Sequence, residues 1–188
     1  MDKKKIVVAV TGASGSIYAR LLLQELQKKI EFIDCCAVVL STNAIDVWTY
    51  ELEQNPKDVI PFQIYDINDF MAPFASGSSG YDVMVICPCS MGTLGRIASG
   101  ISDSLITRCA DVQMKERKKL VLVVRETPYN LIHIKNMQMM TEAGAIICPA
   151  TPSFYNKPQT IEDLVLTVVH RVMSLIDLPS DQKRWGDR

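Results

Sequence analysis

Two short segments of the chain combine glycine, small residues and hydroxyl side chains where a predicted strand leads into a predicted helix. They are Thr11–Ser16 and Pro88–Thr93. Segments of this kind present hydroxyls and free backbone N–H groups at a helix N-terminus, where an anion or a phosphate can bind. A serine N-cap beside a glycine turn would have the same composition. The two interpretations are equally good for one segment, but two segments after different strands favour a phosphorylated ligand.

The first segment matches neither of two common nucleotide-binding motifs. The dinucleotide motif Gly-x-Gly-x-x-Gly would need glycine at positions that hold Ser14 and Ile17, and the Gly-Lys-Ser/Thr of a P-loop does not follow. An NAD site would also place an acid at the end of the second strand, whereas Glu31 and Asp34 fall at its start. These mismatches disfavour NAD and ATP, and they favour a mononucleotide with a terminal phosphate, such as FMN.

A third segment places two charged residues at the end of a predicted buried strand. Arg125 and Glu126 leave that strand together, which is costly unless each charge has a partner. They could pair with each other or cap the next helix. Alternatively, Arg125 could bind a ligand phosphate or ring while Glu126 acts as an acid or base. The position at a strand end favours the second interpretation.

Other charged residues have a simpler interpretation. Arg108, Asp111 and Lys115 are spaced by three and four residues, so they share one face of a predicted helix and indicate a solvated salt-bridge row. His133 and His170 fall in the middle of two distant helices. No Ser-His-Asp set can therefore be assembled from the sequence.

The elements that would position these residues alternate along the chain. Apolar runs predict strands over Lys5–Thr11, Ile33–Leu40, Phe62–Tyr65, Asp82–Cys87, Leu120–Val124 and Ala145–Cys148. Amphipathic stretches predict helices over Ile17–Lys29, Asn43–Glu53, Met91–Ser99, Asp103–Lys118, Leu131–Ala143 and Thr160–Leu178. This alternation predicts an α/β fold with a doubly wound, mainly parallel sheet and helices on both faces. Ligands of such sheets bind beyond the carboxyl ends of the strands, where all three segments lie.

The composition limits the function classes. A length of 188 residues predicts a single domain spanning residues 1–188 with a polar tail at 179–188, which frays or docks through Trp185. A net charge of -1 does not suggest a nucleic-acid binder. No apolar run reaches the roughly 18 residues of a membrane helix, and no signal peptide is recognisable. Two linker-like stretches are Gln54–Pro61 and Ala72–Gly80, and the second has no core pattern, which predicts a mobile loop or lid.

The six cysteines form no Cys-x-x-Cys pair and have no histidine at zinc-binding spacing. Most lie in or beside apolar runs, where a free cysteine behaves as a small hydrophobe. We therefore expect reduced core thiols in a cytoplasmic protein, with no metal site. A redox or nucleophilic role is the less favoured alternative, and Cys87 and Cys89 are its candidates because a helix begins beside them.

A set of motifs runs in order through nearly the whole chain. It consists of Thr11–Gly15, Met71-Ala72-Pro73 through Ser79, Cys87–Leu94, Ala110–Val112 with Lys115–Arg117, Arg125–Pro128, Phe154-Tyr155 and Arg184–Gly186. Together these motifs resemble the UbiX-type flavin prenyltransferases, including the subgroup associated with hydroxyaryl acid decarboxylases. The resemblance implies a Rossmann-like fold, no metal, a homododecamer and reduced FMN as acceptor. The family transfers a dimethylallyl group from dimethylallyl monophosphate to flavin N5 and C6, and the product, prenylated FMN, serves UbiD-type decarboxylases.

The resemblance also implies roles for individual residues. The positions that match FMN-binding residues are Gly12, Ala13, Ser14, Ser41, Ser90, Met91, Gly92, Thr93 and Arg125. Those that match the allyl phosphate site are Arg108, Lys115, Tyr155 and Arg171, and those that match catalytic positions are Ser14, Glu51, Lys115 and Glu126. On this interpretation Arg108 and Lys115 are phosphate ligands, reached across a subunit interface, rather than a surface row.

The chemistry of allyl transfer suits these residue types. Breaking an allylic C–O bond expels phosphate, which cations and hydroxyls can hold, and the site must exclude water that would trap the allyl cation. Ring closure at C6 then releases a proton, which Glu126 or the departing phosphate can accept.

Two other functions stay open at this point. One is an FMN-dependent decarboxylase of cysteine-containing peptides or pantothenate conjugates, which shares the fold; its active-site histidine on an early helix and its asparagine-containing strand-end motif are not found in this sequence. The other is a non-catalytic FMN carrier, against which the additional candidate phosphate-binding residues argue.

Overall fold

The computed structural model describes residues 3–180. Within that range, a single parallel sheet has the strand order β3-β2-β1-β4-β5-β6. Its strands are β1 (Lys4–Val10), β2 (Ile33–Leu40), β3 (Gln63–Tyr65), β4 (Val83–Cys89), β5 (Lys119–Val124) and β6 (Ile146–Ile147). The order reverses between β1 and β4, as in doubly wound sheets. The predicted Rossmann-like α/β fold is confirmed.

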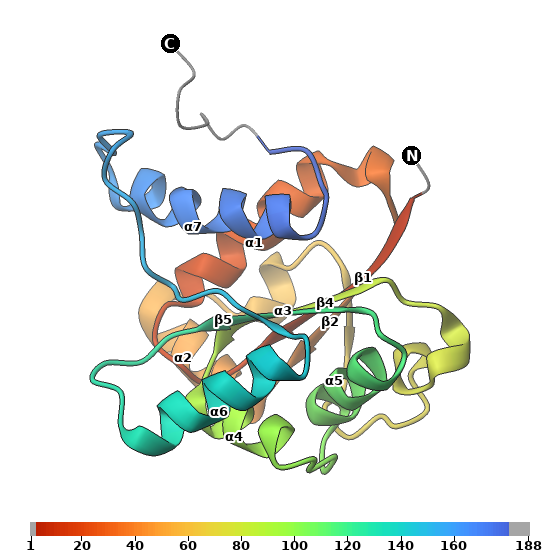
Figure 1. Cartoon of the computed structure of the whole chain (residues 1–188). Coiled ribbons are helices and arrows are strands. Elements are labelled where there is room, and N and C mark those ends of the chain that lie inside the picture. The colour runs from red at the N-terminus through yellow and green to blue at the C-terminus, as the bar shows by residue number, and fades with distance from the viewer. Residues whose placement is uncertain (1–2, 181–188) are drawn as a thin grey trace.

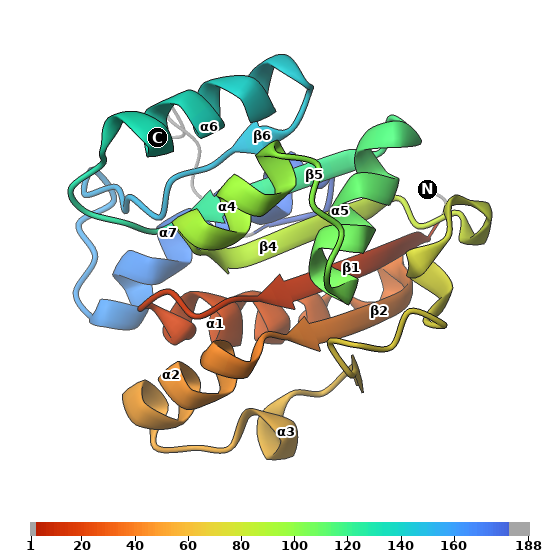
Figure 2. The same cartoon turned by 90° about the horizontal axis from the view of Figure 1, so that it is seen from below.

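Helices cover both faces of this sheet (Figure 1). They are α1 (Ser16–Lys28), α2 (Thr42–Leu52), α3 (Pro56–Val59), α4 (Met91–Ala98), α5 (Leu105–Lys115), α6 (Leu131–Glu142) and α7 (Ile161–Leu175). Helices α1, α2 and α7 contribute to one hydrophobic cluster, and α4, α5 and α6 contribute to the other. Figure 2, seen from below, shows α4, α5 and α6 in front of the sheet and α1 behind it.

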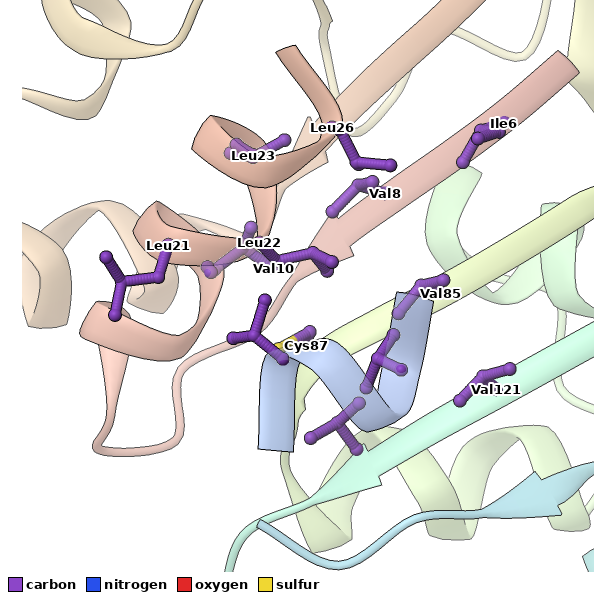
Figure 3. Packing of buried hydrophobic residues seen from close by; sticks show 14 of the residues in the cluster. Ile6, Val8, Val10, Leu21, Leu22, Leu23, Leu26, Val85, Cys87 and Val121 are labelled. Carbon is purple, nitrogen blue, oxygen red and sulfur yellow. The ribbon is translucent and has the colours of Figure 1, made fainter. Parts of the chain in front are cut away.

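The alternation of side chains along β1 explains why the core has two halves. Ile6, Val8 and Val10 belong to the cluster under α1 and α7, whereas Val7 and Ala9 belong to the opposite cluster. All five are at most 1% exposed, because successive side chains of a strand point to opposite faces and both faces are covered. Figure 3 shows the leucines of α1 packed over Val8 and Val10. Each fully buried aliphatic side chain contributes roughly 1.5–3 kcal/mol.

Some helices begin at other residues than the sequence predicts, because capping residues set where a helix begins. The helix predicted from Asp103 begins two residues later, because Ser104 is its N-cap: the Ser104 hydroxyl accepts from the Thr107 N–H and the Thr107 hydroxyl accepts from the Ser104 N–H. The predicted linker Gln54–Pro61 contains the short helix α3, which Asn55 caps through the N–H of Lys57. The predicted role of Trp185 lies outside the described residues.

The segment between β3 and β4 corrects a prediction. The sequence shows no core pattern in Ala72–Gly80 and predicts a mobile loop or lid, but the segment forms two 3₁₀ turns, Pro73–Ala75 and Gly77–Ser79. Phe74 is fully buried, and its ring packs edge-on against Tyr65 and Tyr81 at centroid distances of 5.0 and 5.5 Å. One aromatic side chain among small residues gives no periodic pattern, which is why the sequence alone misses this anchor.

No helix among residues 3–180 is both long enough and apolar enough to cross a membrane.

Candidate active site

The loops at the carboxyl ends of β1, β2 and β4 contact one another directly. The Thr11 hydroxyl donates to the carbonyl of Pro88 (2.8 Å) and accepts from the N–H of Ser90 (2.8 Å). A Cβ on Gly12 would lie 2.5 Å from the Cβ of Asn43, so only glycine permits this close approach to the start of α2. The two segments predicted to bind an anion are therefore joined into one site.

A cavity of about 310 Å³ opens at this junction. Three helix N-caps line it: Ser41 of α2, Ser90 of α4 and Ser104 of α5. The remaining lining residues are Gly12, Thr42, Asn43, Ile67, Thr93, Arg96, Asp103, Ile106 and Thr107. Three positive helix ends and several hydroxyls make this cavity suitable for a phosphorylated ligand.

The predicted flavin-binding residues divide into two groups around this cavity. Gly12, Ser41, Ser90 and Thr93 line it. The remaining ones are not among its lining residues: Ala13 and Met91 are buried, Ser14 is exposed, Gly92 lies in the first turn of α4, and Arg125 follows β5. Sequence reasoning missed Asn43, Arg96, Asp103 and Ser104, which line the cavity and have no motif of their own.

The N-terminus of α1 holds a carboxylate from α2. Both carboxylate oxygens of Glu51 accept from the N–H of Gly15 (2.9 and 3.0 Å), and one also accepts from the N–H of Ser16 (2.7 Å). Gly15 itself has φ of 109° and offers no side-chain cap. Partial burial would raise the pKa of Glu51, but hydrogen bonds from Ser14, Ser16 and Gly15 outweigh it and lower the pKa. The first segment is therefore not the open anion cradle that the sequence predicts: Glu51 already binds its N–H groups.

A second cavity, of about 170 Å³, brings together two residues that lie far apart in the sequence. Tyr155, from the loop before α7, and Arg171, on α7, both line it. The other lining residues are Cys148, Pro149, Thr151, Ser153, Thr167 and Val168. A phenol, a guanidinium and nearby hydroxyls can hold a phosphate. Sequence reasoning missed Ser153 and Thr167.

The side chains of Arg125 and Glu126, at the end of β5, have different surroundings. Glu126 is exposed, and its carboxylate accepts from the N–H of Thr127 (2.9 Å). Arg125 lies near the phenol of Tyr18. Burial and the Cys87 thiol raise the pKa of Tyr18, and the charge of Arg125 partly offsets this. The hydroxyl of Tyr18, another residue that sequence reasoning missed, donates to the carbonyl of Ala150 (3.4 Å).

Arg108 and Lys115 do not join either cavity within one chain. Helix α5 begins at the first cavity and runs toward the opposite end of the sheet, where Lys115 pairs with Glu116 just before β5 starts. Arg108 donates from Nε to the carbonyl of Ala75 (3.0 Å) and from Nη1 to Asp111 (3.0 Å). Within the chain these residues form the salt-bridged row that their spacing indicates.

The cysteines are free thiols, as predicted. Cys87 and Cys89 lie inside β4, and burial raises the pKa of both, that of Cys89 to about 12. These thiols stay protonated near neutral pH and are poor nucleophiles. Among residues 3–180, no group of three or more His, Cys, Asp or Glu side chains is placed to hold a metal ion.

Comparisons with known proteins agree with this geometry. Residues 1–173 match the family model named Flavoprotein. The chain is 41% identical to the flavin prenyltransferase UbiX of Methanocaldococcus jannaschii, over 97% of this chain and 98% of that protein. The crystal structure of AnUbiX (PadA1) in complex with FMN and dimethylallyl pyrophosphate superposes with a TM-score of 0.93, at 42% identity and over 99% of both chains.

A second solved structure is nearly as similar. The dodecameric FMN-dependent Ubix-like decarboxylase of Escherichia coli O157:H7 has a TM-score of 0.91 and 37% identity, over 96% of this chain and 97% of that one. The matches extend over both cavities and all the strand-end loops described above. The chain belongs to the flavoprotein family and, within it, to the UbiX-type flavin prenyltransferases.

Proposed function

We propose that this protein transfers a dimethylallyl group from dimethylallyl monophosphate to N5 and C6 of reduced FMN, and so makes prenylated FMN. One observation carries the proposal: the chain matches AnUbiX, which was solved with FMN and dimethylallyl pyrophosphate, over 99% of both chains. The two cavities at the strand ends support it, since the reaction needs one site for a flavin and one for a second phosphate.

The larger of the two cavities described above, that of about 310 Å³, is the proposed FMN site. The hydroxyls of Ser41, Ser90 and Thr93 and the N-termini of α2 and α4 suit the phosphorylated end of the flavin. We assign the remaining flavin contacts to Gly12, Ala13, Ser14, Met91, Gly92 and Arg125. These residues bind and orient the acceptor, while the flavin ring supplies the nucleophilic N5 and C6.

The smaller cavity is the proposed site for the donor phosphate. Tyr155 and Arg171 hold the phosphate and stabilise its charge as the allylic C–O bond breaks. The hydroxyl of Ser14, which donates to Glu51 in this structure, is proposed to turn from that carboxylate and donate to the phosphate instead. Arg108 and Lys115 are proposed to reach this phosphate from a neighbouring subunit, because their own chain directs Lys115 toward the other end of the sheet.

The two carboxylates Glu126 and Glu51 are proposed to have different roles. Glu126 is exposed at the end of β5 and is proposed to accept the proton lost from C6 as the new ring closes, or to share that role with the departing phosphate. Glu51 is proposed to hold Ser14 and the start of α1 in place for the donor.

Assembly into a homo-oligomer, a dodecamer like the similar protein of Escherichia coli O157:H7, is part of the proposal. The first turn of α6 supports it, because it exposes three apolar side chains, Leu131, Ile132 and Ile134, that a second copy could cover. We further propose that the chain is one domain and that its product is delivered to a UbiD-type decarboxylase. A cytoplasmic location is also proposed, and the free thiols are consistent with it.

The flavin mass tests the function directly. The protein is incubated with reduced FMN and dimethylallyl monophosphate without oxygen, and the extracted flavin is weighed; we expect a mass increased by one dimethylallyl group. Unmodified flavin from a folded protein would reject the proposal. Saturable binding of dimethylallyl monophosphate without turnover would indicate a flavin carrier, and release of CO2 from a cysteine-terminated peptide would indicate the decarboxylase alternative.

A further inference from the structure

The larger cavity contains a cation that no sequence motif singles out. Arg96 lines the cavity from α4, and Asp103 lines it from the loop before α5. Both side chains are 55% exposed. Among the described residues that line this cavity the others are uncharged, so Arg96 is the only positive side chain there that a ligand would meet.

The guanidinium of Arg96 turns back along its own helix. A Cβ on Gly92 would lie 3.9 Å from Nη1 of Arg96, which places the guanidinium beside the first turn of α4. The N-cap Ser90 and Thr93 belong to the same turn and line the same cavity. A cation near a helix N-terminus faces the positive end of the helix dipole, which is unfavourable unless an anion lies between them.

Asp103 supplies only part of the required negative charge. Its Oδ2 lies 3.4 Å from Nε of Arg96, and its Oδ1 accepts from the hydroxyl of Thr107 (3.3 Å). An ion pair this exposed contributes little. One solvated carboxylate therefore faces a guanidinium and the N-termini of α2, α4 and α5. This excess of positive charge suits a dianion.

We propose that Arg96 binds the 5′-phosphate of FMN and that Asp103 competes with this phosphate for the guanidinium. This inference rests on the proposed function, in which FMN occupies the cavity. A guanidinium matches the geometry of a phosphate with paired N–H groups. Riboflavin lacks the phosphate but has the same ring and ribityl chain. Arg96 is therefore a determinant of selectivity for FMN over riboflavin.

The experiment measures the dissociation constants of oxidised FMN and of riboflavin by quenching of flavin fluorescence. The proteins are the wild type, Arg96→Ala, Arg96→Lys and the control Arg20→Ala. Arg20 is a suitable control because it is also a helix-borne arginine paired with a carboxylate, Glu162 (2.7 Å), but on the α1–α7 face. We expect Arg96→Ala to weaken FMN binding roughly 10- to 100-fold, the loss of a hydrogen bond to a charged group, and to leave riboflavin binding unchanged.

The other variants sharpen the result. Arg96→Lys keeps the charge without the paired N–H groups and should weaken FMN binding less than Arg96→Ala does, and Arg20→Ala should match the wild type. Asp103→Asn should bind FMN about two- to fivefold more tightly, since the competing charge is gone. Equal losses of FMN and riboflavin affinity in Arg96→Ala would show that Arg96 only shapes the cavity. An unchanged FMN affinity would show that the phosphate lies elsewhere. Either result overturns the inference.

These measurements use no prenyl donor, so they do not depend on catalysis. A wild-type protein that selects FMN through Arg96 but makes no prenylated flavin would overturn the proposed function alone. A protein that makes prenylated flavin but whose Arg96→Ala variant keeps its preference for FMN would overturn this inference alone.

Discussion

Different tasks are proposed for single side chains at the strand ends, and the task proposed for Glu126 is the one closest to the reaction. Its carboxylate is exposed and its observed partner is the N–H of the next residue, so it contributes little to the fold. The proton lost from C6 requires a base near the flavin. An exposed carboxylate that does little for the fold, such as that of Glu126, is therefore a suitable candidate for this base.

We expect Glu126→Gln to slow formation of prenylated FMN by roughly 10²-fold or more, the usual contribution of a general base, with an unchanged melting temperature. Turnover is measured by flavin mass under anaerobic conditions. The exposed Glu142 of α6 provides the control, because Glu142→Gln makes the same change away from the site. Normal turnover in Glu126→Gln would assign proton removal to the departing phosphate.

Glu51 has the opposite character, since it stabilises the protein. Its carboxylate holds the N–H groups of Gly15 and Ser16 at the start of α1. Replacing it with glutamine removes the charge and one acceptor, so we expect Glu51→Gln to lose about 1–3 kcal/mol of stability at pH 7. Urea unfolding measures this loss, and the exposed neighbour Glu53→Gln should unfold like the wild type.

The loss in Glu51→Gln should depend on pH. Hydrogen bonds lower the pKa of Glu51 in the folded protein, so its stabilising contribution is complete above the unfolded value of about 4.3 and disappears as the pH falls through the lower folded-state pKa. The wild type and Glu51→Gln should therefore converge in stability as the solution is acidified through this range. A difference that stays constant down to acid pH would contradict the assigned hydrogen bonds.

At the scale of elements, the segment between β3 and β4 is held by one buried ring. Phe74 contacts Tyr65 and Tyr81, and the carbonyl of the adjacent Ala75 accepts from Arg108 of α5. This segment thereby links the edge of the sheet to α5, whose N-terminus forms part of the larger cavity. Residues 72–80 contribute no lining residue to either cavity described above, so their contact with α5 is their link to the site.

We expect Phe74→Ala to lower the free energy of unfolding by about 3–5 kcal/mol, the usual cost of deleting a buried aromatic ring. Urea unfolding followed by circular dichroism measures it. Phe70, four residues earlier, is 46% exposed, and Phe70→Ala should change stability by about 0.5 kcal/mol at most. Equal effects of the two substitutions would contradict the assigned packing.

At the scale of the whole molecule, one chain brings only some of the proposed phosphate ligands together. Tyr155 and Arg171 share a cavity, but α5 carries Lys115 to the other end of the sheet. A site assembled from two subunits resolves this separation, and the similar dodecameric protein shows that such chains can associate. We therefore expect catalysis to require assembly of the subunits.

Mixed oligomers test this conclusion. We expect Lys115→Ala and Arg171→Ala to be inactive as separate oligomers but to regain activity when co-expressed, because about one quarter of the sites would combine two intact surfaces. Co-expressing Tyr155→Phe with Arg171→Ala is the control, since both changes affect the same cavity of one chain and cannot complement each other. Failure of the first pair to recover activity would contradict a site shared between two subunits.

The sequence by itself determined the architecture and where a site must lie. Strands buried on both faces must be continuous apolar runs, and the carboxyl ends of parallel strands must meet at one edge of the sheet. The sequence therefore predicts site loops after β1, β4 and β5, and residues of the first two line the larger cavity. The roles of their residues came from a resemblance carried by motifs over nearly the whole length.

Only the tertiary structure decided which of those groups meet. Glu51 reaches Gly15 across 36 residues of chain, Thr11 meets Pro88 across 77, and the ring of Phe74 packs against both Tyr65 and Tyr81. Each contact depends on how a helix or loop is rotated and packed against the sheet. Packing of this kind joins residues distant in sequence and leaves no local pattern that could predict it.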